Sequence, residues 1–171
     1  MKQPLPDVEQ LLSRLADQLR PVVNSETALV GIYTGGVWIA EWLHRALAIG
    51  VPLGTLDVSF YRDDYGVIGL HAQTRPSEIP FEVEGRHIVL VDDVLYTGRT
   101  IRAAMNELFD YGRPASIRLA ALIDRGGREL PISAEFVGAR MEVPAQQLVS
   151  LEQTAGGGLM LHARPWKRAE R

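Results

Sequence analysis

The chain has 171 residues, no cysteine and a formal net charge of −3 at neutral pH. This length and a 46% hydrophobic content suffice for one core, so we expect a single domain over residues 1–171. Disulfides, thiolate chemistry and a cysteine zinc site are excluded, and the acidic balance gives no overall attraction to nucleic acid. No apolar run reaches membrane-spanning length and the N-terminus lacks a signal-peptide core, which predicts a cytoplasmic protein without membrane association.

The first third of the chain alternates helical and strand patterns. Asp7 is a favourable N-cap for a first helix, and Pro21 helps to end it. The apolar residues of that helix share one face: Val8, Leu11, Leu12, Leu15 and Leu19. Four predicted segments follow, namely a strand at 28–32, a turn at 34–36, a helix at 37–48 and a strand at 53–60. Residues 61–80 look like a hairpin or a mobile loop.

Residues 88–100 are the most informative segment, an apolar run followed by two aspartates and a Thr-Gly-Arg-Thr turn. The run has the length and β-branched content of a strand buried on both faces, so Asp92 and Asp93 are expected where that strand ends. Ligands of open α/β sheets bind at this edge. From Arg99 to about Tyr111 apolar residues return at helical spacing, so the turn opens a helix whose free amides attract phosphate.

Each part of this segment has a physical task in binding a ribose phosphate. Gly98 allows a backbone conformation that turns amides towards an anion, while Thr97 and Thr100 add hydroxyl donors. Asp92 and Asp93 accept hydrogen bonds from vicinal ribose hydroxyls and favour positive charge at the anomeric carbon. A metal site of the phosphoreceiver type and a plain helix cap are the alternatives. The threonine-glycine turn at this spacing favours the nucleotide-sugar site.

The remainder of the chain predicts one more strand of the sheet and a small hood. A strand at 117–123 completes a βαβ order, which indicates an α/β fold with a mainly parallel sheet flanked by helices. Short apolar runs that are expected to form the hood lie at 135–138, 147–151 and 159–161. Residues 162–171 are basic, and we expect a solvated, flexible tail in which Trp166 is available to stack on a nucleic-acid base.

The chain resembles the type I phosphoribosyltransferases. Residues 88–100 are similar to their phosphoribosyl-diphosphate signature, and the wording Val-Asp-Asp-Val-Leu-Tyr-Thr-Gly-Arg-Thr is similar to that of pyrimidine-operon attenuation regulators that are also uracil phosphoribosyltransferases. Further similarity to those regulators lies in three segments, residues 56–64, 112–116 and 124–132. The resemblance covers most of the chain, and it implies a type I phosphoribosyltransferase-like fold.

The resemblance implies that uracil and phosphoribosyl diphosphate react to give uridine monophosphate (UMP) and diphosphate. Asp92 and Asp93 are then the candidate catalytic residues, and Mg²⁺ is expected to bind through the substrate near them. The residues that match the ribose 5-phosphate loop are Tyr96, Thr97, Gly98, Arg99 and Thr100. Tyr96 stands where some purine-using relatives carry a catalytic aspartate, which favours a pyrimidine and leaves this loop without an assigned general base.

A diphosphate loop is implied at Thr34, Gly35 and Gly36, where glycine amides approach an anion closely. A plain strand-to-helix turn is the alternative. The family commonly has arginine where this chain has Gly35, so a diphosphate-binding charge is missing unless Arg62, on the flexible-loop side, compensates. Arg62 also has an interpretation as an exposed partner of the neighbouring aspartates.

Base recognition is expected where the hood meets the sheet. By motif matching, Asp124 and Arg125 lie there, and backbone groups around Leu148 are expected to pair with the uracil edge. For Asp124, a helix cap or a surface ion pair is an equal alternative.

Regulation is the second activity that the resemblance implies, through binding to the leader mRNA of a pyrimidine operon. Asp17 and Gly127 replace two histidines of the family's RNA-facing surface, whereas Arg14 and Arg128 stay as candidate phosphate contacts. The chain is either an enzyme that retains regulation or an RNA-binding nucleotide sensor with weak or no catalysis, and we favour the enzyme. The resemblance also implies a homodimer or a larger homo-oligomer.

Overall fold

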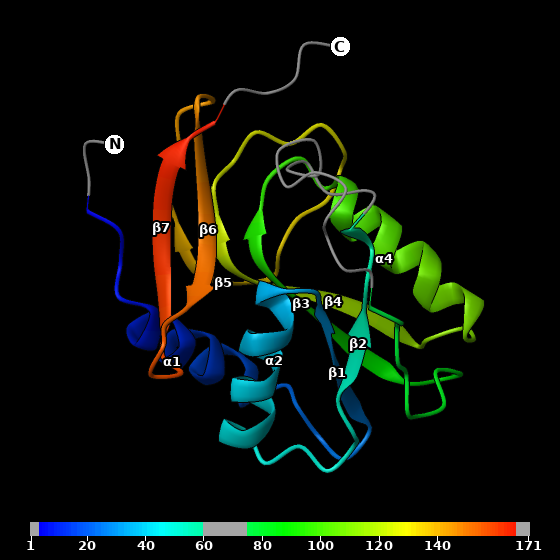
Figure 1. Cartoon of the computed structure of the whole chain (residues 1–171). Coiled ribbons are helices and arrows are strands. Elements are labelled where there is room, and N and C mark those ends of the chain that lie inside the picture. Colours follow the sequence, from blue (N-terminus) through cyan, green and yellow to red (C-terminus); the bar gives the residue numbers. More distant parts are fainter. Residues whose placement is uncertain (1–3, 60–74, 167–171) are drawn as a thin grey trace.

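The computed structural model describes residues 4–59 and 75–166 (Figure 1). Its helices and strands follow in the order α1 (Val8–Leu19), β1 (Thr27–Ile32), α2 (Gly35–Ala46), β2 (Gly54–Leu56), β3 (His87–Leu95), α4 (Arg99–Asp110), β4 (Ser116–Asp124), β5 (Phe136–Arg140), β6 (Gln147–Gln153) and β7 (Leu159–Pro165). None of the helices in these two ranges has the length and apolar content needed to span a bilayer.

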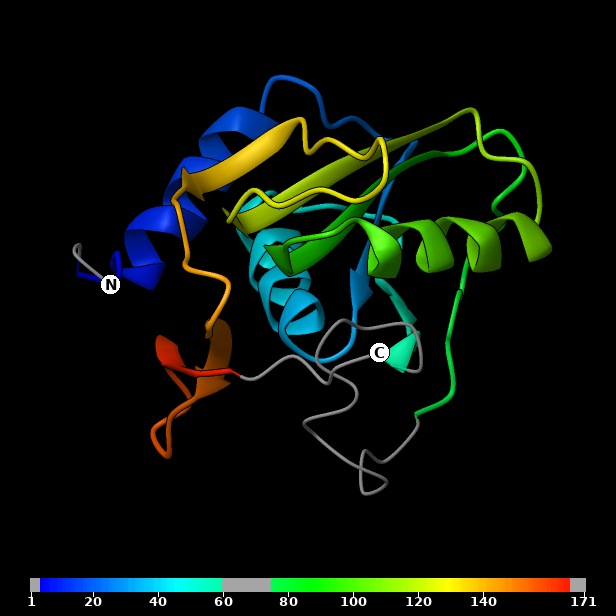
Figure 2. The same cartoon turned by 90° about the horizontal axis from the view of Figure 1, so that it is seen from above.

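Strands β1 to β5 form one parallel sheet in the order β2-β1-β3-β4-β5. Helices α1 and α2 cover one face of this sheet and α4 covers the other, as Figures 1 and 2 show. The predicted α/β fold with a parallel sheet between helices is therefore confirmed. In this strand order β2 lies on one side of β1, and β3 lies on the other side of β1. Ligands of open α/β sheets bind beside the carboxyl ends of two strands at which the order reverses in this way.

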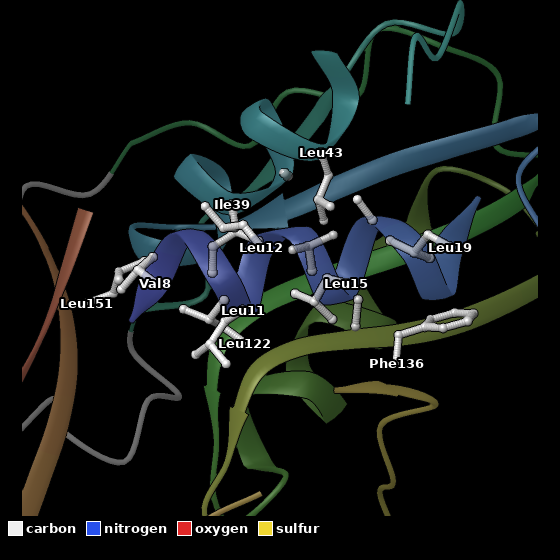
Figure 3. Close-up of a cluster of buried hydrophobic side chains, with 14 of the residues drawn as sticks. Val8, Leu11, Leu12, Leu15, Leu19, Ile39, Leu43, Leu122, Phe136 and Leu151 are labelled. Carbon is white, nitrogen blue, oxygen red and sulfur yellow. The ribbon is translucent and has the colours of Figure 1, made fainter. Parts of the chain in front are cut away.

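Helix α1 buries the apolar stripe that its sequence predicts (Figure 3). Asp7 caps it by accepting a hydrogen bond from the backbone N–H of Gln10 at 2.9 Å. The stripe lies against Leu43 of α2 on one side and against Phe136 of β5 on the other. Truncating a fully buried leucine such as Leu15 to alanine costs about 2–5 kcal/mol of stability.

Strands β1 and β3 lie at the centre of the sheet and are buried on both faces. Leu29 and Val89 belong to the core cluster beneath α1 and α2, whereas Val30 and Leu90 belong to the cluster beneath α4. This two-sided burial explains why the β3 sequence is an apolar run rather than an alternation of apolar and polar residues.

The boundaries of α2 and β2 differ from the prediction in ways that affect the site. Helix α2 begins at Gly35, so the glycines that were predicted as a turn form the first turn of the helix. Strand β2 is shorter than predicted and ends at Leu56. Immediately after it, the carboxylate of Asp57 accepts hydrogen bonds from the backbone N–H groups of Ser59 and Arg75.

The hood consists of the antiparallel pair β6 and β7. The prediction that residues 135–138 belong to it is wrong, because β5 pairs in parallel with β4 and completes the main sheet. The prediction of a flexible, solvated tail is also wrong for residues 162–166. His162 pairs with Ser150 inside the hood, and Trp166 is only 3% exposed.

Candidate active site

Asp92 and Asp93 lie near the carboxyl end of β3, beside the loop that follows β1. Strand β3 pairs with β1 as far as Val91 and with β4 as far as Leu95. The aspartates therefore lie inside β3 and not beyond its end. They come directly after Val91, the last residue of β3 that pairs with β1. Both are buried, with exposed fractions of 3% and 4%. Two carboxylates buried at the edge of a parallel sheet fit the predicted ligand site.

The two carboxylates have different surroundings. Asp92 Oδ1 accepts a hydrogen bond from the backbone N–H of Asp93 at 2.9 Å. Asp93 Oδ1 is enclosed and has no hydrogen-bond partner in the described part of the chain. Enclosing an acceptor without a partner costs about 1–3 kcal/mol, more if it is charged. Because native proteins rarely leave such atoms unsatisfied, Asp93 is the stronger candidate for contacting a ligand.

The loop after β1 packs directly against these carboxylates. Thr34 is the N-cap residue of α2, and Gly35 and Gly36 are buried in its first turn. A Cβ at Gly35 would lie 2.5 Å from Asp93 Oδ2, and a Cβ at Gly36 would lie 2.4 Å from the carbonyl oxygen of Val91. Only glycine therefore fits at either position while β3 keeps this arrangement.

This packing changes the interpretation of Gly35. An arginine at this position would need a Cβ in the space that the Asp93 carboxylate occupies. The position of the Asp93 carboxylate in this structure therefore requires glycine, not arginine, at residue 35. Arg62, which is predicted to compensate, lies outside the described residues. Arg75 places its guanidinium carbon 5.1 Å from the ring centroid of Tyr33, the residue that begins this loop, and the peptide bond after Tyr33 is cis.

The threonine-glycine turn opens α4 as predicted. Gly98 is the N-cap residue and has a φ of 93°, a left-handed conformation that favours glycine. Thr97 is fully buried, and its Oγ1 accepts a hydrogen bond from the backbone N–H of Arg99 at 3.2 Å. The first amides of a helix lack acceptors within the helix, and the positive end of the helix dipole lies there. This loop therefore suits a phosphate group.

The loop that follows β4 holds the phosphate loop in place. The backbone N–H of Glu129 donates to the carbonyl oxygen of Thr97 at 3.0 Å, and the Glu129 carboxylate pairs with the Arg99 guanidinium at 2.9 Å. Arg128 Nη1 donates to the carbonyl oxygen of Tyr96 at 2.7 Å. The side chain of Arg99, predicted to bind the ribose phosphate, is thus engaged with Glu129.

Asp124, a predicted base-pocket residue, is engaged within the protein. Its Oδ1 accepts hydrogen bonds from the backbone N–H of Gly126 at 3.0 Å and from Arg128 Nη2 at 2.6 Å. The structure thus shows the ion pair that was the alternative for Asp124. Arg128 also donates from Nε to the carbonyl oxygen of Ile132 at 2.9 Å. Its guanidinium is directed inwards, which disfavours the predicted RNA contact at Arg128.

Arg125 joins the hood to the phosphate loop. The residue is 5% exposed, and its guanidinium donates to the backbone carbonyl oxygens of Gln147 at 3.0 Å and Pro144 at 3.2 Å. The guanidinium carbon lies 4.1 Å from the ring centroid of Tyr96. Leu148 is buried in β6, directly after Gln147. Arg125 thus connects the predicted base-pocket strand to the residue that precedes Thr97.

Trp166 is the site residue that sequence reasoning missed. It was expected in a solvated tail, but its ring centroid lies 6.0 Å from that of Tyr96, with an angle of 72° between the two planes. Its backbone N–H donates to the carbonyl oxygen of Gln146 at 2.7 Å. The one available signal was an isolated tryptophan in an otherwise polar segment, because such a large apolar ring is usually buried.

Positions 17 and 127, where the resemblance implies RNA-facing histidines in the family, have different environments in this chain. Gly127 has a φ of 75°, and a Cβ there would lie 2.4 Å from Cε2 of Tyr96, so a histidine does not fit beside this ring. Asp17 and Arg14 are both exposed on α1. Arg14 is therefore the predicted RNA contact whose side chain faces solvent.

The carboxylates also fit the implied magnesium ion. No group of three or more histidine, cysteine or acidic residues among those described is arranged to hold a metal. Mg²⁺ commonly binds through one or two carboxylates together with substrate oxygens. The enclosed Asp93 Oδ1, with Asp92 next to it, supplies the donor that such a substrate-bound ion needs.

Comparison with known proteins identifies the class. Residues 3–147 match the model of the phosphoribosyl transferase domain. The fold is similar to that of a hypoxanthine-guanine phosphoribosyltransferase from Bacillus anthracis, with a TM-score of 0.64 and 19% identity over 82% of this chain and 85% of that chain. For a Trypanosoma cruzi hypoxanthine phosphoribosyl transferase the TM-score is 0.63 and the identity 25%, over 83% and 79%. The chain thus contains a phosphoribosyl transferase domain and has the fold of that class of enzyme.

Relatives in sequence narrow this class. The "Bifunctional protein PyrR" of Pseudomonas fluorescens strain Pf-5 is 54% identical over 155 residues, which cover 88% of this chain and 92% of that protein. The protein of the same name from Pseudomonas aeruginosa PAO1 is 54% identical over 151 residues, covering 86% and 89%. The chain belongs to the PyrR family of phosphoribosyltransferases, and the predicted family membership is confirmed.

Proposed function

We propose that this protein transfers the phosphoribosyl group of phosphoribosyl diphosphate to uracil, forming UMP and diphosphate, and that the same nucleotide site makes it a UMP-responsive regulator of a pyrimidine operon. The observation that carries the catalytic half is the enclosed Asp93 carboxylate, which lies beside the loop after β1 and whose Oδ1 has no hydrogen-bond partner among the described residues. A site used only to sense a nucleotide has no need of a buried charge at the reacting carbon.

Each loop of the site has a separate task in this reaction. The amides and hydroxyls at Thr97 and Thr100 bind the 5′-phosphate, while Gly35 and Gly36 let backbone amides approach the diphosphate. Asp92 and Asp93 accept hydrogen bonds from the ribose hydroxyls and stabilise the positive charge that develops at the anomeric carbon. Mg²⁺, when bound, neutralises the charge of the leaving diphosphate.

One assay tests the proposed reaction. The protein is incubated with Mg²⁺, phosphoribosyl diphosphate and, in turn, uracil, cytosine or hypoxanthine, and nucleotide formation is followed by chromatography. We expect UMP from uracil and no product from the other bases. The names of the structural neighbours give hypoxanthine as the base that those enzymes use. If this protein also preferred hypoxanthine, the assignment of uracil would be overturned.

The phosphate loop gives a test of how the substrate is oriented. Thr97→Ala and Thr100→Ala should each weaken the binding of phosphoribosyl diphosphate and of UMP together by roughly tenfold, because both ligands carry the same 5′-phosphate and a hydrogen bond to a charged group is lost. Binding of free uracil should change little. Calorimetric titration measures all three, with Thr154→Ala in the exposed turn between β6 and β7 as a matched control. Loss of uracil binding alone would assign the loop to the base.

A variant of Arg14 tests RNA binding, which is the regulatory part of the proposed function. Affinity for a pyrimidine-operon leader RNA should fall steeply with salt and should be weaker in Arg14→Ala, because a phosphate contact is lost. Asp17→Asn should strengthen it by removing a repelling charge. UMP formation should be unchanged in both variants, and Arg113→Ala, at an exposed arginine before β4, is the control. Equal affinity for an unrelated hairpin in filter-binding titrations would contradict a regulatory role.

A further inference from the structure

The loop after β1 lies beside carboxylates and contains no charged side chain of its own. Its residues 33–36 read Tyr-Thr-Gly-Gly. Asp92 and Asp93 are buried in the neighbouring strand β3, and Asp57 directly follows the neighbouring strand β2. A diphosphate group is strongly negative, so a site for it at this edge of the sheet needs a cation that offsets the repulsion from these carboxylates.

Arg75 is the arginine beside this loop whose guanidinium is open to a ligand. Arg99 and Arg128 are each paired with a carboxylate, and Arg125 donates to backbone carbonyl oxygens of the hood. The Arg75 side chain is exposed, and its guanidinium has no hydrogen bond or ion pair to any residue within 4–59 and 75–166. Arg75 can therefore bind an anion without first giving up a contact with an oxygen atom of the protein.

Hydrogen bonds hold the backbone of Arg75 at the carboxyl end of β2. Its N–H donates to Asp57 Oδ2 at 2.6 Å. The backbone N–H of Asp57 in turn donates to Ser77 Oγ at 3.0 Å. Glu78 and Thr55 exchange both of their backbone hydrogen bonds, each at 2.8 Å. These contacts fix where the Arg75 side chain starts, next to the loop after β1, and leave its charged end exposed.

Tyr33 holds the guanidinium beside this loop. The guanidinium carbon of Arg75 lies 5.1 Å from the centroid of the Tyr33 ring, which is within the range of a cation–π contact. The backbone N–H of Tyr33 donates to the carbonyl oxygen of Leu56 at 2.9 Å, so the tyrosine is attached to the same strand end as Arg75. A guanidinium that packs on an aromatic ring keeps its in-plane N–H groups available, and these match the oxygens of a phosphate.

We propose that Arg75 binds the diphosphate group of phosphoribosyl diphosphate and that Tyr33 positions its guanidinium for this contact. Arg75 thereby supplies the positive charge that the resemblance implies at residue 35, where the Asp93 carboxylate leaves room only for glycine. This inference rests on the proposed function and deepens it, because Arg75 lies outside every segment that carries the family resemblance.

Removal of the charge is the first test. Arg75→Gln should weaken the binding of phosphoribosyl diphosphate and of free diphosphate, both with Mg²⁺, by roughly tenfold or more, because a hydrogen bond between charged groups is lost. UMP and ribose 5-phosphate lack the diphosphate group, so their affinities should stay unchanged. Calorimetric titration measures all of these ligands. Arg113→Gln, which removes an exposed arginine before the amino end of β4 and away from the site, is the matched control.

A double-mutant cycle tests the positioning by Tyr33. Tyr33→Leu removes the aromatic ring and should weaken the binding of phosphoribosyl diphosphate roughly threefold, whereas Tyr33→Phe keeps the ring and should retain the affinity. In the Arg75→Gln background, Tyr33→Leu should cause no further loss, because the tyrosine acts through the arginine. An equal loss with and without Arg75 would show that Tyr33 supports the loop directly, and it would remove the positioning role from the inference.

Two results would overturn the assignment of Arg75. One is an unchanged affinity of Arg75→Gln for phosphoribosyl diphosphate and diphosphate, and the other is an equal loss of affinity for UMP. Arg62→Gln is measured in parallel, since Arg62 is the compensating charge that the sequence suggested. A loss of diphosphate binding in Arg62→Gln alone would assign the charge to Arg62 and overturn the inference as well.

Because these titrations need no turnover, they separate the inference from the proposed function. If the unmodified protein binds phosphoribosyl diphosphate but forms no UMP from uracil, the proposed function fails and the titrations still decide the role of Arg75. If UMP is formed while Arg75→Gln binds phosphoribosyl diphosphate normally, the proposed function stands and the inference is wrong. If the unmodified protein does not bind phosphoribosyl diphosphate, both fail.

Discussion

Asp93→Asn is expected to lower kcat for UMP formation by roughly a hundredfold or more. The substitution keeps the shape of the side chain but removes the negative charge that favours positive charge at the anomeric carbon. The thermal midpoint should stay unchanged or rise, because Oδ1 is enclosed without a partner in the described structure and a neutral amide costs less to bury than a carboxylate. Initial rates at saturating substrate and calorimetric melting measure the two quantities.

An exposed aspartate supplies the control for this variant. Asp110→Asn removes one carboxylate from the end of α4, where the side chain faces solvent, and should leave both kcat and the thermal midpoint unchanged. Full activity in Asp93→Asn would remove Asp93 from the catalytic machinery. A large drop in its melting temperature would instead make the carboxylate part of the structural core.

Gly35→Ala and Gly36→Ala should differ in their effect on the site although the residues are neighbours. The Cβ at position 36 would meet the carbonyl oxygen of Val91 at 2.4 Å, and this oxygen is held in β3, so Gly36→Ala should lower the free energy of unfolding by about 1–3 kcal/mol or more. The Cβ at position 35 would meet the Asp93 carboxylate, which can rotate away, and also Asp93 Cβ at 2.8 Å, which moves only if β3 shifts. Gly35→Ala should therefore lower the free energy of unfolding as well, by less than Gly36→Ala, and should lose most of its activity because Asp93 is displaced.

Urea unfolding and initial rates distinguish these two outcomes. Gly50→Ala is the control, since a Cβ at position 50 has no neighbour within 4 Å and Gly50 is not in the left-handed region. An active Gly35→Ala would show that the position of Asp93 does not depend on Gly35. The more drastic Gly35→Arg, which introduces the arginine that the resemblance implies at this position, should lose activity for the same reason.

The sequence by itself determined the elements whose signals are local. Asp7 followed by an apolar stripe at helical spacing predicts α1 and its cap, and both are present because capping and amphipathic periodicity act within a few residues. The apolar run of β3 predicts a strand buried on both faces. The left-handed Gly98 at the start of α4 follows from the same kind of short-range chemistry.

Which distant segments meet was decided only by the tertiary structure. Local periodicity does not say which strand a given strand will pair with, so β5 was assigned to the hood, whereas its pairing with β4 places it in the main sheet. For the same reason Trp166 was placed in a solvated tail, although the pairing of β6 and β7 carries it onto Tyr96. The fit of Gly35 against Asp93 depends on two loops brought together by the β1–β3 pairing. Such contacts arise from packing between residues far apart in the chain, and short-range patterns do not encode them.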